Sequence, residues 1–191
     1  AYRSAEDLSK IELTYPLQVY VCDNCWLVQT VDFVDAIDLF KSDYAYFSSA
    51  STSWLAHAEN FTKIITERLS LNQDSFVIEI ASNDGYLLKN FVDSNIPCLG
   101  IEPTLSTALA AEQRGIPVVQ RFFGEKLSQE LVSTGKQADL IIANNVFAHV
   151  PDINDFTLGL MELLKPQGTI TLEFPHLKKL IEQAQFDTIY H

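Results

Sequence analysis

The sequence lacks most of the features that would assign it to a special class of protein. None of its apolar runs approaches the roughly 20 residues that a membrane-spanning helix needs. No charged segment followed by an apolar one opens the chain, so we expect no signal peptide. Only 13 lysines and arginines stand against 25 acidic residues. The net charge of −12 argues against a nucleic-acid partner and against a membrane partner.

Cysteine is also scarce. Three cysteines, an odd number, do not make a disulfide framework, so a cytoplasmic location is expected. The sequence contains no internal repeat and no low-complexity segment. An apolar content of 47% is ample for a core, and 191 residues suit one domain plus an appendage.

The most informative segment is an apolar, β-branched run that starts at Val77 and ends abruptly in a polar turn. Helical spacing of apolar residues follows the turn. This pattern predicts a buried strand, a tight turn, and a helix that packs Leu88 and Phe91 back on the sheet. The turn residues, which we expect to contact a bound cofactor, are Ser82, Asn83, Asp84 and Gly85.

A second apolar run ends in Glu102, seventeen positions after Gly85. An acidic residue at this place is how α/β nucleotide sites hold ribose hydroxyls. Gly85 has no side chain, so we expect the turn backbone to approach the ligand closely. No G-x-G-x-x-G is present, and Asp84 would repel phosphate but suit a cationic amino-acid group. S-adenosylmethionine fits such a turn, since it carries an ammonium group and a ribose but no phosphate. Alternatively, Asn-Asp-Gly serves the geometry of the turn alone.

From Val77 onward, predicted strands and helices alternate, which indicates an α/β fold with a parallel, Rossmann-like sheet. Pro166 and Gly168 are expected to end the fourth of these helices before the last strand. Strands are predicted at 76–82, 98–102, 117–120, 138–144 and 169–174, and helices at 86–94, 105–114, 124–134, 153–164 and 176–184.

Polar residues collect where these strands end, which is where ligands of such sheets bind. Asn144 and Asn145 end the fourth strand, and His149 follows on the ligand side, where a loop can offer imidazole to a substrate. Phe123, with its neighbour Phe122, is a candidate for stacking on adenine, although phenylalanines in such positions are more often core.

The first 72 residues differ from the rest, so we predict a domain boundary between residues 72 and 73. A strand at 17–21 runs into Cys22 and Cys25, the spacing with which zinc ribbons present two thiolates. The alternatives are two half-buried thiols or a redox pair, because a closed zinc site needs four ligands. Residues 54–71 read as a helix, and Tyr44 lies in an aromatic segment that lines either a pocket mouth or an internal interface.

Six segments, in this order, resemble the S-adenosylmethionine-dependent C-methyltransferases of deoxysugar biosynthesis. The resemblance covers nearly the whole chain. The segments are Tyr15–Gln29 with its Cys-x-x-Cys, Glu79–Leu88, Leu99–Pro103, Ala143–Asp152, Glu173–Leu177 and Gln185–His191.

The resemblance implies a class I methyltransferase sheet, preceded by a partial zinc-ribbon-like and helical region. It implies S-adenosylmethionine and zinc as cofactors, and C3 of a nucleotide-linked keto-deoxysugar as the methyl acceptor. Tyr44, His149 and Tyr190 are implied to surround the sugar, and Asp84, Glu102 and the Asn144 region to hold the cofactor. The alternatives are a methyltransferase for another small ketone, or a silent module that binds the cofactor.

Measured against the family pattern, the chain is expected to be a fragment. The first cysteine pair would precede Ala1, and the motif that ends here at Tyr190-His191 continues in the family with a glutamate and a second histidine, the family's proposed base. A third domain, in cis or in trans, is expected as a partner. The fragment is therefore expected to be catalytically incomplete.

Overall fold

The computed structural model describes residues 5–11, 14–40 and 46–185. Tyr44 and Tyr190, two residues implicated above, lie outside these ranges. The chain divides into two compact units, the first ending at Asp35 and the second beginning at Ala36. The domain boundary at residue 72 stays a prediction. In the described part of the chain, every helix is too short or too polar to cross a bilayer.

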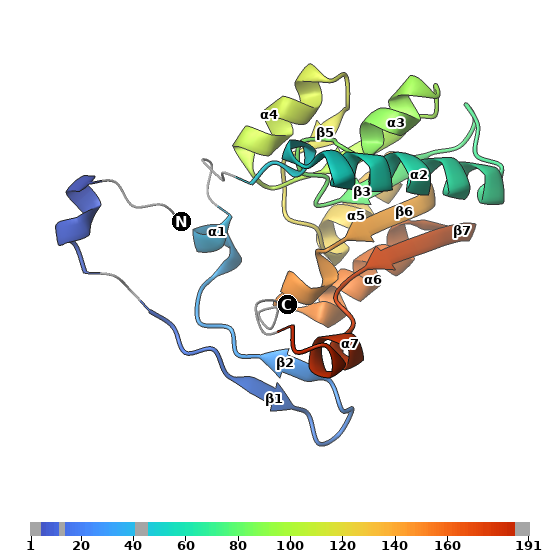
Figure 1. Ribbon diagram of the computed structural model, residues 1–191. Helices are drawn as coiled ribbons and strands as arrows, with labels where there is room; N and C mark the ends of the chain where they lie inside the picture. Colours follow the sequence, from blue (N-terminus) through green and yellow to red (C-terminus); the bar gives the residue numbers. More distant parts are fainter. Residues whose placement is uncertain (1–4, 12–13, 41–45, 186–191) are drawn as a thin grey trace. The chain divides into compact units, whose positions relative to one another are not determined.

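An antiparallel hairpin organises the first unit (Figure 1). Strands β1 (Val19–Val21) and β2 (Val28–Thr30) pair with Tyr20 opposite Gln29. A short 3-10 helix, η1 (Ala5–Ser9), precedes the hairpin. The strand predicted at 17–21 is therefore present, in shorter form, and the connection between β1 and β2 carries the Cys-x-x-Cys segment.

A five-stranded sheet forms the centre of the second unit, in the order β5-β4-β3-β6-β7 (Figure 1). Every pair of neighbouring strands is parallel, which confirms the predicted α/β class. The strand order reverses at β3, so the first crossovers run to one side of it and the later ones to the other. The strands are β3 (Val77–Ile80), β4 (Cys98–Ile101), β5 (Val118–Val119), β6 (Ala138–Asn144) and β7 (Leu164–Glu173).

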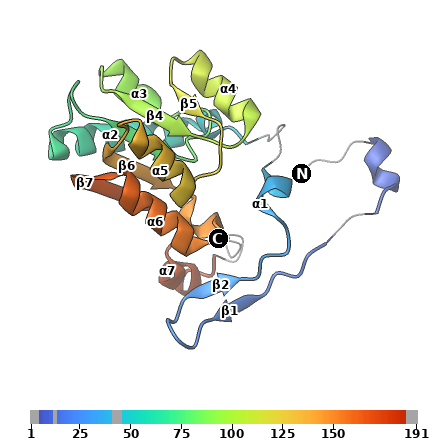
Figure 2. The same cartoon turned by 180° about the vertical axis from the view of Figure 1, so that it is seen from behind.

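Helices cover both faces of this sheet, with α2, α3 and α4 on one face and α5 and α6 on the other (Figures 1 and 2). All five helices predicted from Val77 onward are present. The helices of the second unit are α1 (Ala36–Leu39), α2 (Thr52–Leu69), α3 (Leu88–Asp93), α4 (Leu105–Gln113), α5 (Glu125–Ser133), α6 (Ile153–Leu163) and α7 (Leu177–Glu182), with 3-10 turns η2 (Ser48–Ala50) and η3 (Phe147–His149).

The core consists of two apolar layers, one on each face of the sheet. Val77 packs with α2 and α3, whereas Ile78 and Ile80 pack with α5 and α6. Successive strand residues point to opposite faces, so the polar side chain of Glu79 shares the face of Val77, beneath α2. The buried helix residues Leu88 and Phe91 confirm the expected packing of α3 on the sheet.

The last strand begins earlier than predicted, although the helix before it ends within one residue of the predicted position. Helix α6 ends at Leu163 and β7 begins at once with Leu164, so that Pro166 and Gly168 lie inside the strand. β7 is an edge strand in the order of the sheet, and a proline is tolerated there because one side of the strand needs no ladder hydrogen bonds. The register between β6 and β7 shifts close to this segment, between Ala138 and Leu140.

The packing of the core requires a glycine at position 85. Its φ of +75° lies in the left-handed region, and a Cβ there would overlap Cδ1 of Ile116 and lie 3.1 Å from Cβ of Ala111. Both neighbours belong to α4 or to the segment that follows it. The expected close approach of the turn backbone to a ligand stays a prediction.

We expect Gly85→Ala to lower the free energy of unfolding by roughly 2–4 kcal/mol, the sum of a left-handed alanine and an overpacked contact. Gly135→Ala is the matched control, since its φ is +79° but nothing lies within 4 Å of the added Cβ. It should cost only about 1 kcal/mol. Denaturant titration measures both.

Adding Ile116→Val to Gly85→Ala removes the overlapped Cδ1 and should recover part of the loss. A double variant whose destabilisation equals the sum of the two single effects would contradict the packing explanation.

Candidate functional site at the carboxyl ends of the strands

The turn after β3 is built from residues in unusual backbone conformations. Ala81, Asn83 and Gly85 all have positive φ, at 57°, 49° and 75°. Asparagine and glycine adopt this region readily, whereas alanine does so at a cost of about 1–2 kcal/mol. Strained residues of this kind cluster at functional sites when the surrounding structure holds them in place.

Glu102 is the residue that holds the turn in place. Its side chain is only 5% exposed, and both carboxylate oxygens accept hydrogen bonds. Oε2 accepts from the backbone N–H of Asn83 at 2.9 Å, and Oε1 accepts from the backbone N–H of Thr104 at 3.0 Å and from the Thr104 hydroxyl. The structure thus brings the predicted residues at the ends of β3 and β4 into direct contact.

Ser82 completes the contact between the two strand ends. It is fully buried, and a Cβ on Gly100 would come within 2.5 Å of its Oγ. Only a glycine on β4 leaves room for this hydroxyl. The Ser82 Oγ has no hydrogen-bond partner among the residues that the structure describes.

Asp84 is completely buried and already has a cationic partner. Arg114, at the end of α4, lies with Nη1 3.1 Å from Asp84 Oδ2, and the same nitrogen donates to the Asp84 carbonyl at 2.6 Å. Ser49 Oγ also donates to Oδ2. Both side-chain partners of the carboxylate therefore contact Oδ2, while Oδ1 has no partner within the described ranges.

Glu79 lies beneath the same turn and is 1% exposed. Burial raises its pKa well above the usual value, and the negative charges of Glu102 and Asp84 raise it further. Burial therefore favours the protonated form of the Glu79 carboxyl. Its Oε2 is another buried oxygen that is unpartnered in the described structure.

The segment before α2 is fastened over the turn by Asn83. Its Oδ1 accepts from the Ser48 N–H at 2.8 Å, and its Nδ2 donates to the Tyr46 carbonyl at 3.1 Å. Arg114 adds a bond to Ser49 Oγ at 3.0 Å. The turn is therefore covered by residues that precede the sheet by about thirty positions in the sequence.

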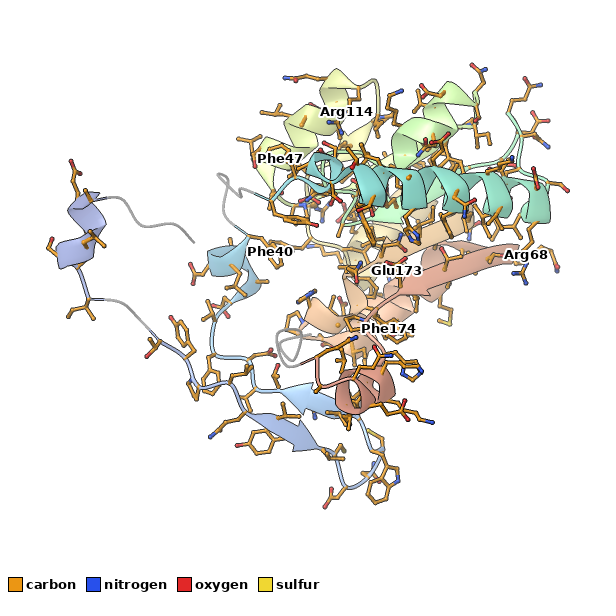
Figure 3. All side chains as sticks on the ribbon, viewed as in Figure 1. Phe40, Phe47, Arg68, Arg114, Glu173 and Phe174 are labelled. Carbon is orange, nitrogen blue, oxygen red and sulfur yellow. The ribbon has the colours of Figure 1, made fainter. Side chains whose placement is uncertain are left out.

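A second polar cluster lies at the ends of β6 and β7. Asn145, with φ 52°, donates from Nδ2 to Glu173 Oε1 at 3.3 Å and from its backbone N–H to the Glu173 carbonyl at 2.7 Å. Glu173 Oε2 lies 3.0 Å from Nε2 of His57 on α2. Glu173 projects from the end of β7 towards α2 (Figure 3).

Three side chains of this cluster were missed in the sequence. The first two are Trp54 and His57, which lie three positions apart on α2 and therefore share a helix face. Glu173 is the third. Its position at a strand end is the same signal that pointed to Glu102, and a Trp-x-x-His pair on an amphipathic helix was the other available signal.

Tyr86 connects this cluster to the turn. Burial raises the pKa of its phenol far above the usual value, with a further contribution from Glu79, while hydrogen bonds with Trp54 and Asn144 oppose the rise. The phenol is therefore neutral at physiological pH. Through it, Asn144 is held on the same face of the sheet as α2.

The other predicted residues lie apart from these contacts. His149 ends η3 and is exposed, with its backbone N–H bonded to the Val146 carbonyl at 2.8 Å. Phe123 packs edge-on against Phe156 of α6, with ring centroids 5.0 Å apart. Its ring thus belongs at least in part to the core layer under α5 and α6, the alternative that the sequence had left open.

The Cys-x-x-Cys segment of the first unit forms a thiolate-stabilising turn. The pKa of Cys22 is lowered by hydrogen bonds from the backbone of Cys25 and then of Asn24. Trp26 follows with φ 64°, and its N–H bonds the Cys22 carbonyl at 2.9 Å. Two cysteines at this spacing supply half of the four ligands of a structural zinc site. Within the described ranges, no histidine, cysteine or acidic residue lies close enough to act as a third ligand beside the two cysteines.

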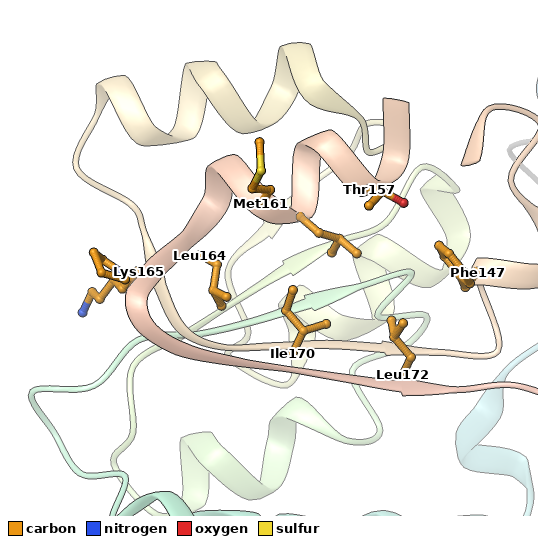
Figure 4. A pocket seen from close by; sticks show the side chains of 9 residues that line it. Phe147, Thr157, Met161, Leu164, Lys165, Ile170 and Leu172 are labelled. Carbon is orange, nitrogen blue, oxygen red and sulfur yellow. The ribbon is translucent and has the colours of Figure 1, made fainter. Parts of the chain in front are cut away.

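An apolar groove of about 560 Å³ lies between α6 and β7, on the other face of the sheet from Glu173 (Figure 4). Ile170 and Leu172 line it from the strand, and Leu160 and Met161 from the helix. Apart from Lys165 and Thr157 its lining is apolar, and it contains none of the residues predicted to bind cofactor or substrate.

Comparison with known proteins identifies relatives of this chain. Residues 1–40 match the family model described as "Putative zinc binding domain", and residues 78–170 match the one described as "Methyltransferase domain". C-methyltransferase NovU of Streptomyces niveus is 32% identical over 186 residues, which are 97% of this chain and 44% of NovU. The chain thus spans less than half the length of this relative.

Solved methyltransferases share the fold. The plantazolicin methyltransferase BpumL superimposes with a TM-score of 0.56 at 14% identity, over 73% of this chain and 57% of BpumL. Streptomyces venezuelae DesVI gives a TM-score of 0.50 at 14% identity, over 64% of this chain and 51% of DesVI. These likenesses confirm the predicted class I methyltransferase sheet. Because the identity to NovU extends over nearly all of this chain, the chain belongs to the S-adenosylmethionine-dependent C-methyltransferases of the deoxysugar type.

Proposed function

We propose that this chain carries the cofactor-binding part of a C-methyltransferase that methylates C3 of a nucleotide-linked keto-deoxysugar. The observation that carries the proposal is the identity to NovU, which extends over 97% of the chain. That stretch includes both polar clusters at the strand ends. The roles of His149, Tyr44 and Tyr190 around the sugar, a further domain as partner, and zinc at Cys22 and Cys25 are parts of the same proposal.

The turn after β3 carries hydrogen-bond acceptors that suit the ammonium group of S-adenosylmethionine. Asp84 Oδ1 and Ser82 Oγ are buried oxygens with no partner in the described residues, and both can accept a hydrogen bond from an ammonium group. A polar group buried without a partner costs about 1–3 kcal/mol, so a ligand that supplies the missing bond is favoured. The turn offers no phosphate cradle, in keeping with a cofactor that carries no phosphate.

Glu102 is the residue that would hold the ribose. A carboxylate has about four acceptor positions, and Glu102 uses three of them within the protein. One ribose hydroxyl takes the free position on Oε2. A second acceptor position, on Oε1, becomes free for the other ribose hydroxyl when the Thr104 hydroxyl turns to Thr107, whose Oγ1 it already contacts.

Carbon methylation needs a group that accepts a proton and a hydrogen-bond donor to the oxygen that becomes negative. When bound, S-adenosylmethionine supplies an electrophilic methyl group on its sulfonium. The chain must remove a proton from the carbon next to the ketone and stabilise the oxygen on which negative charge develops. His149, on the loop after β6, is proposed to polarise this oxygen, with tyrosine hydroxyls as further donors.

We expect Glu102→Gln to weaken binding of S-adenosylmethionine by about 10–100-fold, because hydrogen bonds to a charged group contribute about 1.5–3 kcal/mol. Calorimetric titration of the 191-residue chain measures the affinity. Glu112→Gln, on the exposed side of α4, is the control and should bind like wild type. Equal affinities in all three proteins, with unchanged thermal unfolding, would remove Glu102 from the ribose role.

Methyl transfer from labelled cofactor tests the substrate class. With the proposed further domain present, a nucleotide-linked 4-keto-deoxysugar should gain the label at C3, located by NMR, whereas its 4-hydroxy analogue should gain none. Only the ketone makes the neighbouring proton acidic enough to remove. Label on an oxygen or nitrogen of the product would contradict the proposed C3 chemistry.

For the metal, we expect less than one zinc per chain after dialysis. Two thiolates leave two coordination positions to water, and structural sites owe their strength to four protein ligands. Elemental analysis decides the question, with Cys22→Ser as the variant that should lose the residual metal. One tightly held zinc per chain would show that further residues complete the site.

A further inference from the structure

Three buried side-chain oxygens around the turn after β3 have no hydrogen-bond partner among the described residues. Two of them, Ser82 Oγ and Asp84 Oδ1, are the proposed acceptors for the ammonium group of the cofactor. The third, Oε2 of Glu79, has no part in that contact. Glu79 is 1% exposed, whereas glutamates are almost never fully buried unless they are paired. Burial of this carboxyl group is therefore a cost to the fold that a function would justify.

Glu79 lies beside the Ser82 hydroxyl on one face of the sheet. Its register partner on β4 is Gly100, and a Cβ at position 100 would lie 2.5 Å from Ser82 Oγ. The hydroxyl thus takes the space next to Glu79 that a side chain on β4 would otherwise fill. Glu102 follows two positions after Gly100, so alternation along the strand places its side chain on the same face. The Glu79 carboxyl consequently belongs to the same group of polar side chains as the proposed ribose-binding residue.

The charges around Glu79 leave it without a positive partner in the described structure. The two groups nearby that can be positive already contact other carboxylates, since Arg114 pairs with Asp84 and His57 pairs with Glu173. The titratable groups of the elements packed around Glu79 are Asp84 and Tyr86 of the turn, Cys98 and Glu102 of β4, Arg114 of α4, His57 of α2 and Glu173 of β7.

This environment favours the neutral acid as long as no cation enters it. An ionised carboxylate that is buried without donors or a cation is far more costly than a buried neutral group. Burial raises the pKa of Glu79, and the negative charges of Glu102 and Asp84 raise it further. A positive charge within about 4–6 Å acts in the opposite direction and lowers the pKa of a carboxyl group by about 1–3.

The methyl donor and its product differ in this positive charge. S-adenosylmethionine carries an ammonium group and a sulfonium, whereas S-adenosylhomocysteine keeps the ammonium group and has a neutral thioether. A buried carboxyl group that ionises in response to ligand charge therefore stabilises the donor more than the product.

We propose that Glu79 reads the charge of the bound cofactor: it holds a proton in the ligand-free chain and releases it when S-adenosylmethionine binds. The proposal rests on the cofactor-binding function above. The O–H bond of the carboxyl group breaks, the proton passes to water, and the electron pair stays on the carboxylate, which is then stabilised by the positive charge of the ligand. Glu79 thereby favours the methyl donor over the demethylated product, which the site must release.

Calorimetric titration in two buffers of different ionisation enthalpy counts the protons that binding releases. The 191-residue chain should release more protons to S-adenosylmethionine than to S-adenosylhomocysteine. Glu79→Gln keeps the shape of the neutral acid but cannot ionise, so the difference between the two ligands should disappear. Glu112→Gln, on the exposed side of α4, is the control and should release protons like wild type.

The affinities should follow the same pattern. Binding of S-adenosylmethionine to wild type should strengthen as pH rises, by up to about tenfold per pH unit between the pKa of Glu79 in the bound chain and its higher pKa in the free chain, because one proton leaves on binding. Glu79→Gln should lack this rise. Its preference for S-adenosylmethionine over S-adenosylhomocysteine should be about 10-fold or more below that of wild type.

Thermal unfolding without ligand tests the protonated state by itself. A buried acid whose pKa is raised by folding stabilises the folded state at low pH and loses that effect as pH rises through the folded pKa. Wild type should therefore lose stability relative to Glu79→Gln as the pH rises above about 4, the pKa of an exposed glutamate. A constant difference in stability across pH would contradict a proton held by Glu79.

The outcomes separate this proposal from the function on which it rests. Equal proton release in wild type and Glu79→Gln, or the same pH dependence of their affinities, would overturn the role of Glu79 while cofactor binding stands. Should Glu79→Gln fail to fold, equal proton release to both ligands in wild type would overturn it as well. Failure of S-adenosylmethionine to bind to the folded wild-type chain would instead overturn the function.

Discussion

The hydrogen bonds that Glu102 accepts are the contact on which the rest of the site depends. One oxygen fixes the N–H of Asn83 and the other fixes the start of α4 through Thr104. Because the acceptor lies at the end of β4 and the donor in the turn after β3, this carboxylate sets the spacing between the two strand ends. The left-handed conformations of Ala81 and Asn83, which are unfavourable alone, persist because the turn is held from outside.

Acidic residues are concentrated around this turn, and the fold manages their repulsion in three ways. Asp84 has the guanidinium of Arg114, Glu102 has backbone donors, and burial beside both raises the pKa of Glu79. Each solution places a different constraint on the site. Arg114 ties α4 to the turn, Glu102 ties β4 to it, and the raised pKa of Glu79 lowers the electrostatic cost of placing its carboxyl group under α2.

Helix α2 connects the two polar clusters, although it precedes the sheet in the chain. The segment at its start is bound to Asn83 and Asp84, and its first two turns carry Trp54 and His57 to the ends of β6 and β7. Residues that are more than a hundred positions apart thus meet at one edge of the sheet. Helix α2 thus brings residues of both polar clusters together at the carboxyl ends of the strands.

The sequence alone determined the α/β class, the positions of the strands from Val77 onward apart from the start of β7, and the polar residues at the strand ends, because strand periodicity and turn chemistry are local properties. It pointed to Glu102 for the same reason, since a carboxylate closing a buried strand is a local signal. Only the tertiary structure decided the partners: Arg114 for Asp84, the core for Gly85, and His57 for Glu173. These contacts join elements far apart in sequence, and their geometry follows from how helices cross the sheet, which no local pattern encodes.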